Sequence, residues 1–125
     1  MSNQLLLKNF LATGAIGASL IVIANADGSV SVAGAGGPAT ALFGVNDDIA
    51  LANGDYGDIV KAGIADVVFG GVIAAGDPLT SDVNGNAVKA APAAGVNVRI
   101  IGFAEVAGVA GDIGQVNIAP GVIQG

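Results

Sequence analysis

Asp82, Asn84 and Asn86 are the residues of this 125-residue chain whose types and spacing come nearest to a ligand site. Each is separated from the next by one residue, as the oxygen ligands of a calcium loop are. An EF-hand loop also needs a glycine directly after the third ligand and a bidentate glutamate further on. Here Gly85 comes before Asn86, and the first glutamate after it is Glu105. The pattern therefore does not predict a calcium site, and a turn explains it better.

The segment that holds these residues, AAGDPLTSDVNGNAVKA, has the pattern of a β-hairpin. Pro78 opens a strand, where its fixed φ and missing N–H are tolerated, and Leu79–Ser81 continues it. Asn84 and Gly85 form a dipeptide that favours a tight turn, and Ala87–Ala90 is the return strand. Every polar side chain in the segment then has a local structural role.

Four of the other acidic residues form two close pairs that lack partners for catalysis. Asp47 and Asp48 are neighbours, and neighbouring side chains on a strand point to opposite faces. Asp55 and Asp58 flank a tyrosine and a glycine in an expected turn. No GxxxxGK[ST] motif is present, and neither Gly-Asp turn lies between a strand and a helix, as a phosphate-binding loop would. We interpret both pairs as solvated acidic turns.

Ser81, Lys61 and Lys89 are candidate nucleophiles, and none has the neighbours that nucleophilic catalysis requires. The chain has no histidine and no cysteine, which removes the commonest general base, thiol chemistry, cysteine zinc sites and disulfides. Arg99 lies in an apolar run and is expected to be a rim cation or half of an intersubunit ion pair. The sequence therefore predicts no catalytic residue, no cofactor and no metal site, and the chain is not expected to be an enzyme.

Composition points instead to assembly. Hydrophobic residues make up 53% of the chain and charged residues only 11%, so a domain of 11.9 kDa is expected to bury apolar surface against another chain. The net charge is −6 with four cations, which argues against direct binding of nucleic acid. The apolar runs are shorter than the roughly 20 residues that span a bilayer, and no basic region precedes the first of them. Neither membrane insertion nor classical secretion is expected.

Short β-prone runs separated by turn residues fill the chain, with no sustained 3.6-residue periodicity, so the predicted class is all-β. Asp27-Gly28 is expected to close a hairpin, residues 33–41 to form a flexible loop, and Pro120-Gly121 to end the ordered pattern. Residues 3–12 fit either a short helix or an extended arm. The expected strands are Leu20–Ile23, Ser29–Val32, Leu42–Val45, Ile59–Lys61, Ile64–Phe69, Leu79–Ser81, Ala87–Ala90, Val96–Ile101 (extended by Gly102–Ala107) and Gln115–Ile118.

The chain also resembles itself at a distance of 57 or 58 residues. FGV at 43–45 corresponds to IGF at 101–103, and GDYGDIV at 54–60 corresponds to GDIGQVN at 111–117. Gly28 likewise precedes Gly85 by 57 residues. The common offset suggests two similar half-units packed into one small barrel or sandwich. The alternative is the repetitiveness of any β-protein rich in glycine, alanine and valine.

Three segments taken in order resemble the capsid cement, or head decoration, proteins of tailed bacteriophages. They are FGVNDDIALANGDYGDIVKAG, VIAAGDPLTSDVNGNAVKA and IIGFAEVAGVAGDIGQVNIAPG, within residues 17–121. Each is weak alone, and their order carries the resemblance. The loop GAGGPATA at 34–41 matches no part of the pattern.

The resemblance implies a small β-barrel or β-tulip-like domain, residues 17–125, with an N-terminal arm, residues 1–16. It implies a virion protein, made in the bacterial cytoplasm, that sits on the outer surface of an icosahedral head and stabilises the expanded shell. Its partners would be the major capsid protein and itself, as a homotrimer or a dimer. The arm would contact the capsid or a neighbouring subunit through Leu5, Leu6, Leu7, Phe10 and Leu11.

Two other functions remain open. A subunit of a surface layer or an appendage would also be a self-assembling β-protein, although it would usually carry an export signal. A small β-barrel enzyme or ligand binder would need convergent polar groups in a pocket, which the sequence does not supply.

Overall fold

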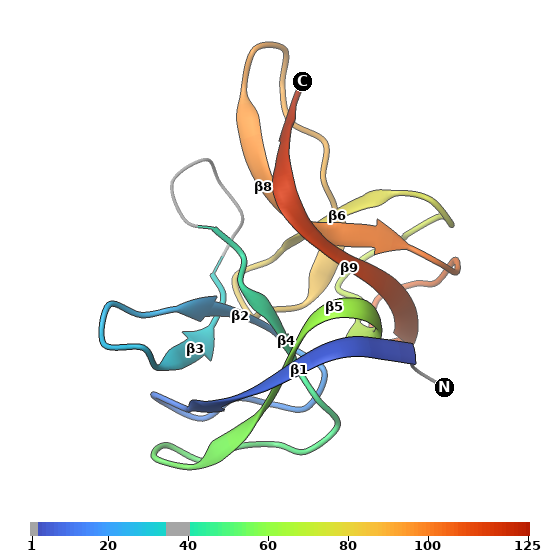
Figure 1. Ribbon diagram of the computed structural model, residues 1–125. Helices are drawn as coiled ribbons and strands as arrows, with labels where there is room; N and C mark the ends of the chain where they lie inside the picture. The colour runs from blue at the N-terminus through green and yellow to red at the C-terminus, as the bar shows by residue number, and fades with distance from the viewer. Residues whose placement is uncertain (1–2, 35–40) are drawn as a thin grey trace.

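The computed structural model describes residues 3–34 and 41–125, with side chains from Leu6 onward in the first strand. These residues form nine β-strands in one strongly curled sheet and no helix, so no helix among them is able to cross a membrane (Figure 1). The predicted all-β class and its barrel-like curvature are confirmed. The strands are β1 (Asn3–Leu11), β2 (Ile21–Ala24), β3 (Val30–Val32), β4 (Gly44–Asn46), β5 (Tyr56–Val68), β6 (Pro78–Ser81), β7 (Ala87–Lys89), β8 (Asn97–Ala104) and β9 (Ile113–Gln124).

The order across the sheet is β3-β2-β4-β5-β9-β8-β6-β7, and β1 pairs with β5. Both predicted hairpins are confirmed, because β2 pairs with β3 and β6 pairs with β7, each antiparallel. Acidic side chains stabilise both turns. The Asp27 carboxylate accepts hydrogen bonds from the backbone N–H (3.0 Å) and the hydroxyl (2.6 Å) of Ser29. Such Asx-type contacts are local, which is why the sequence predicts them well.

Residues 3–12 form no helix. Residues 3–11 are strand β1, which runs antiparallel to β5 from Leu11 opposite Tyr56 to Asn3 opposite Ile64. The segment treated as an arm is therefore an edge of the main sheet. The expected loop at 33–41 falls largely on residues 35–40, which lie outside the described part of the chain.

Strand β5 corrects one prediction. The two expected strands, Ile59–Lys61 and Ile64–Phe69, are a single strand of 13 residues. Gly63 has φ +92° in its middle, a backbone conformation that costs glycine little. It remains in both ladders, opposite Gln4 of β1 and Ile118 of β9. Gly63 therefore bends the strand without ending it.

Strand β9 corrects a second prediction, because order does not stop at Pro120. The ladder with β8 shifts register between the pairs Gly102–Ile118 and Ile100–Gly121. Pro120 falls in this irregularity, where its missing N–H removes no regular ladder bond. The far ends of β8 and β9 continue as a two-stranded ribbon that projects from the sheet (Figure 1).

The two half-units expected from the sequence are present in the topology. Half-unit 1 comprises β1, β2, β3, β4 and the first half of β5. Half-unit 2 comprises the second half of β5, then β6, β7, β8 and the first half of β9. The isolated bridge between Ala12 and Val30 recurs 57 residues later between Phe69 and Ala87. The bridge from residue 16 to 51 likewise recurs from 73 to 108.

One buried cluster lies within half-unit 1, the other holds residues of both half-units, and equivalent positions in them are filled differently. In half-unit 1, Ala12 and Leu51 share one space, whereas the equivalent pair in half-unit 2 is Phe69 and Gly108. A Cβ on Gly108 would lie 2.6 Å from the Phe69 ring. One large side chain thus occupies equivalent space in both half-units, but it comes from the loop between β4 and β5 in half-unit 1 (Leu51) and from the residue directly after β5 in half-unit 2 (Phe69). This exchange keeps the cores close-packed.

Candidate interaction surface

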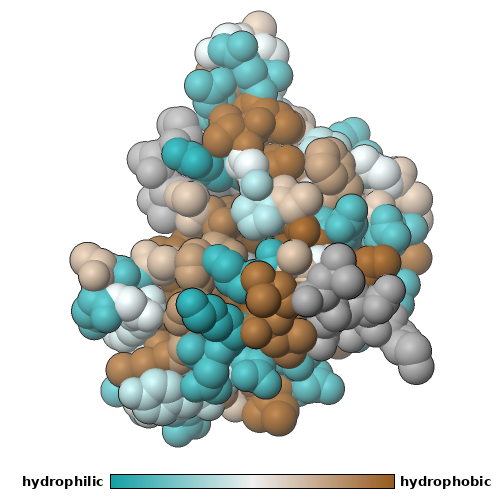
Figure 2. Space-filling model, in the orientation of Figure 1, coloured by the Kyte–Doolittle hydropathy of each residue, from teal (hydrophilic) through white to brown (hydrophobic). Residues whose placement is uncertain are grey.

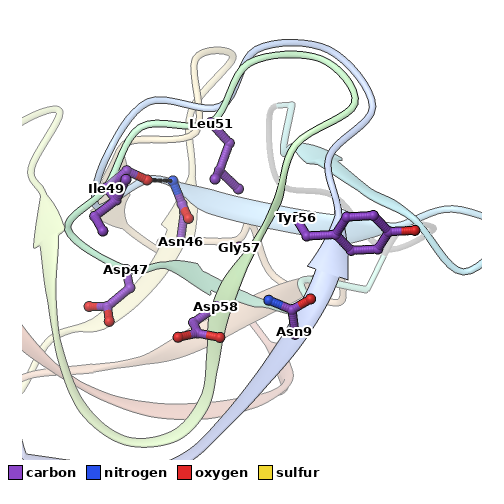
Figure 3. Close-up of a pocket in the computed structure, with 8 residues that line it drawn as sticks. All are labelled: Asn9, Asn46, Asp47, Ile49, Leu51, Tyr56, Gly57 and Asp58. Carbon is purple, nitrogen blue, oxygen red and sulfur yellow. Dashed lines mark hydrogen bonds between the residues drawn. The ribbon is translucent and has the colours of Figure 1, made fainter.

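An open pocket of about 190 Å³ lies where β1, the start of β5 and the loop after β4 meet (Figure 3). Its lining residues are Asn9, Asn46, Asp47, Ile49, Leu51, Tyr56, Gly57 and Asp58. The buried Asn46 side chain fixes its wall. The Asn46 amide donates hydrogen bonds to the carbonyl oxygens of Ile49 (3.0 Å) and Gly17 (2.9 Å). The loop that carries Asp47 and Ile49 is therefore held in one position.

The pocket brings together polar groups that the sequence analysis assigned to separate turns. Asn9 and Asp58 are cross-strand partners, and the Asp47 N–H donates to the Asp58 carbonyl oxygen at 3.2 Å. Asp47 is half-buried, whereas Asp48 is exposed. Asp55 serves its own turn, because its carboxylate accepts the Ala52 N–H at 2.9 Å. Within the described residues, no three carboxylates are placed to hold a metal ion.

Half-unit 2 carries the same chemistry at equivalent positions, which the sequence analysis missed. We name the two groups ledge 1 (Asn9, Asp47, Ile49, Tyr56, Asp58) and ledge 2 (Asp66, Glu105, Val106, Ile113, Gln115). The cross-strand pair Asn9–Asp58 recurs as Asp66–Gln115, with carboxylate and amide exchanged between the strands. The Glu105 N–H donates to the Gln115 carbonyl oxygen at 2.9 Å, as Asp47 does in ledge 1.

Each ledge therefore offers two carboxylates, one amide and two exposed apolar side chains. Tyr56 is 68% exposed and its equivalent Ile113 is 64% exposed. Packing restricts which side chains fit at buried positions, but it does not restrict exposed positions in this way. Retention of the same surface chemistry in both half-units points to an interaction role.

A basic aromatic face lies beside the second buried cluster and consists of Lys8, Phe10, Phe43 and Lys61. The Lys61 ammonium sits 3.1 Å from the centre of the Phe43 ring, and Phe10 meets Phe43 edge to face at 5.1 Å. Burial, and then the charge of Lys8, lower the pKa of Lys61. Lys61 is thus a cation held against the Phe43 ring.

The other candidate residues have structural roles. The Asp82 carboxylate accepts hydrogen bonds from the N–H groups of Asn84 (2.8 Å) and Asn86 (3.0 Å), which confirms the turn interpretation. Lys89 forms an ion pair with Asp77 at 4.0 Å. Ser81 is buried, and its hydroxyl donates to the Asp82 carbonyl oxygen. The half-buried Arg99 lies in β8, where its carbonyl oxygen accepts the Thr80 hydroxyl.

The apolar residues expected to contact a partner differ in what they offer. Leu7 packs on the main buried cluster and Phe10 on the second cluster. Leu11 is half-buried, and Leu6 is 50% exposed. The side chain of Leu5 lies outside the described ones. On the face shown in Figure 2, hydrophobic residues form separate patches with hydrophilic residues between them, including one on the projecting ribbon.

Comparison with known proteins adds evidence on the fold. No protein-family model and no curated protein matches this sequence. Among solved structures, the chain is similar to the N base of the head fiber protein gp8.5 of bacteriophage phi29, with a TM-score of 0.63. The match has 19% identity and covers 91% of this chain and 93% of that chain. The chain therefore has the fold of this head fiber base along nearly its whole length.

Proposed function

We propose that the chain is a structural protein of a bacteriophage head, which binds the outer capsid surface as a cement and stabilises the expanded shell. One observation carries the proposal: the fold matches a head fiber base over 91% of a chain whose ordered motifs resemble head decoration proteins. In this proposal the protein is a virion component with no catalytic role.

Mass action supplies the mechanism. A protein that binds the intact expanded shell, and not its ruptured or dissociated states, shifts the equilibrium toward the shell. The partner would be the major capsid protein, and the binding unit would be a homotrimer or a dimer. Several copies held together then engage several capsid subunits at once, which raises the overall affinity without new contacts.

The two ledges support a lattice as the partner. Equivalent chemistry on the two half-units suits a surface that presents the same feature more than once, as adjacent capsid subunits do. Strand β1 offers a second contact mode. It is the longest edge of the described sheet, and an edge strand can pair with a strand of another chain.

Co-sedimentation with heads tests the proposal. Purified chain would be mixed with expanded heads and with unexpanded procapsids of the same phage, and the rupture temperature of the heads would be measured with and without it. We expect saturable binding to expanded heads and a higher rupture temperature. Absence of binding, or binding with no change in rupture temperature, would contradict a cement role.

Ledge variants locate the contact. Tyr56→Ser and Ile113→Ser each remove one exposed apolar side chain, and we expect the double variant to bind heads more weakly than either single one. Val83→Ser, on the β6–β7 turn, is the matched control because Val83 is 71% exposed and lies outside both ledges. Equal binding by all these variants would assign the capsid contact to another surface.

A further inference from the structure

Three residues of half-unit 1 form a row within the buried core that the two half-units share. Ile21, Val45 and Val60 lie side by side across β2, β4 and β5, and all three are fully buried. They belong to the same buried cluster as four residues of half-unit 2, which form the rim of that half-unit's core: Ala65, Val67, Ile101 and Ile118. The row of half-unit 1 and the rim of half-unit 2 therefore belong to one buried core.

A hydrogen bond locks this internal contact at one end. The Ile21 N–H donates to the Gly85 carbonyl oxygen at 2.8 Å, so β2 meets the β6–β7 turn. Gly85 is buried there, and a Cβ on it would lie 2.8 Å from Val32 and 3.5 Å from Leu20. The hairpin of half-unit 1 is thus pressed against the turn of half-unit 2.

The same row exists in half-unit 2, where it reaches the surface. Pro78, Phe103 and Asn117 lie side by side across β6, β8 and β9 in the register of the first row. Phe103 is 40% exposed and Asn117 is exposed, and neither belongs to a buried cluster of the described residues. We name Pro78, Phe103 and Asn117 the outer row.

The rim also has a counterpart, which is the basic aromatic face of half-unit 1. Lys8, Phe10, Phe43 and Lys61 take the places that Ala65, Val67, Ile101 and Ile118 take in half-unit 2. Phe10 and Phe43 pack on the second buried cluster and are only partly buried. Half-unit 2 thus has an outer row that packs on no rim, and half-unit 1 has the equivalent of a rim on which no row packs.

We propose that a second copy of this chain completes the contact, with the outer row of one copy packed on the basic aromatic face of the next. This contact between copies would repeat the arrangement that already joins the two half-units within one chain. The proposal names the surface for self-association and does not depend on capsid binding.

The chemistry of the two surfaces is complementary. The Phe103 ring can pack against Phe10 and Phe43, where aromatic pairs gain stability beyond the area they bury. The amide oxygen of Asn117 can accept a hydrogen bond from the ammonium of Lys8 or Lys61. The outer row carries no charged side chain, so the two cations would meet only an amide and an aromatic ring.

The ends of the contact are also oppositely charged. In the internal contact, the Val32 side chain lies against Gly85. The equivalent of Val32 in half-unit 2 is Lys89, and the equivalent in half-unit 1 of the turn that holds Gly85 carries Asp27. The Lys89 side chain is 57% exposed and Asp27 is exposed. Pro78 has no N–H and cannot repeat the bond from Ile21 to Gly85, so side chains make the intermolecular contact.

Light scattering of the purified chain over a concentration series tests the surface. We expect a mass that is a multiple of 11.9 kDa for the wild type. We expect Phe103→Glu and Lys61→Glu each to weaken association by about 30-fold or more, as loss of a central contact does. Val72→Glu is the matched control because Val72 is 79% exposed and outside both surfaces. Circular dichroism would establish that each variant is folded.

A charge exchange and a cross-link make the test specific. Asn117→Lys combined with Lys61→Glu should restore association that Lys61→Glu alone loses. The chain has no cysteine, so Asn117→Cys and Lys8→Cys variants mixed together should form a disulfide between copies under oxidation, and more of it than either variant alone. A monomeric wild type, an oligomer that both charge variants leave intact, or no mixed disulfide would overturn the inference. None of these outcomes bears on capsid binding, which is tested separately by co-sedimentation with heads.

Discussion

The Ile21 N–H donates a 2.8 Å hydrogen bond to the Gly85 carbonyl oxygen and so joins the hairpin of half-unit 1 to the turn of half-unit 2. The equivalent of Gly85 in half-unit 1 is Gly28, which has an almost identical φ of +87° against +83°. Their surroundings differ. No atom of residues 3–34 and 41–125 outside the turn lies within 4 Å of a Cβ built on Gly28, whereas a Cβ on Gly85 would meet Val32 and the Ile21 carbonyl oxygen.

Substitution of these two glycines separates backbone strain from packing. Gly28→Ala should cost about 1 kcal/mol in free energy of unfolding, because only the positive φ is penalised. Gly85→Ala should cost roughly 2–4 kcal/mol, because the same strain is added to overpacking between the half-units. Urea unfolding of both variants measures the difference. Equal losses in free energy of unfolding would mean that the residues around Gly85 accommodate the added methyl group without a loss of stability.

The exchange of large side chains between the two cores predicts a rescue. Phe69→Ala should destabilise the protein by about 3–5 kcal/mol, because it leaves a cavity in half-unit 2. Gly108→Leu alone should also destabilise it, because its Cβ would lie 2.6 Å from the Phe69 ring. The double variant reproduces the alanine and leucine of half-unit 1.

Unfolding measurements on the two single variants and the double variant give the coupling between the sites. We expect the double variant to recover at least about 1–2 kcal/mol relative to the sum of the two single losses. Additive losses would show that the equivalent spaces in the two half-units have different shapes.

Asn46 is a buried amide that supports ledge 1. Asn46→Ala leaves the carbonyl oxygens of Gly17 and Ile49 without this donor, and we expect a loss of about 2 kcal/mol in thermal or urea unfolding. Asn53→Ala is the control, because Asn53 accepts a single hydrogen bond, from the exposed Gly14 N–H. A loss no larger than that of the control would mean that the loop after β4 finds other donors.

Asp27 gives a pH-dependent contribution whose sign follows from its hydrogen bonds. The Ser29 hydroxyl, and then the Ser29 N–H, hold the pKa of Asp27 below its ordinary value of 3.8 in the folded protein. A carboxyl group with a lowered folded pKa contributes stability above its unfolded pKa, and loses it as pH falls through the folded one.

The comparison of the wild type with Asp27→Asn tests this sign. The wild type should have the higher melting temperature at neutral pH, and the gap should close as pH falls below about 4. Melting curves measured by circular dichroism at both pH values give the gap. A gap that stays constant with pH would show that the charge of Asp27 does not stabilise the turn.

Local features of this fold could be predicted from the sequence. The Asp27-Gly28 and Asn84-Gly85 turns depend on residues within a few positions of one another, so their signals are short and direct. The half-unit repeat was also readable, because Gly-Asp turns recur at one offset.

The errors came from pairing partners that are distant in the sequence. Gly63 and Pro120 are residue types that often end strands. Each nevertheless lies within a strand here, because that strand pairs with its neighbours on both sides of the residue. Whether residues 3–12 are helical could not be decided from their own types, because β5 supplies the pairing.

The ledges were missed for a related reason. The carboxylate of ledge 1 at Asp58 corresponds to an amide at Gln115, while the amide Asn9 corresponds to the carboxylate Asp66. Aligned position by position, the two half-units differ at both sites. Only the pairing of the strands shows that the chemistry is the same.

Strand β5 belongs to both half-units, since its first half pairs with β1 and β4 and its second half pairs with β9. Neither half-unit thus contains all its strands if the chain is divided there. A fragment that ends before Gly63 would lack the pairing with β9. A fragment that starts after Gly63 would lack the row Ile21, Val45 and Val60, which belongs to the same buried core. We therefore expect a single cooperative unfolding transition, and a proteolytic cut within β5 should release two segments that cannot refold alone. If the chain arose by duplication, the junction lies inside a strand, so the two copies were interdependent from the start.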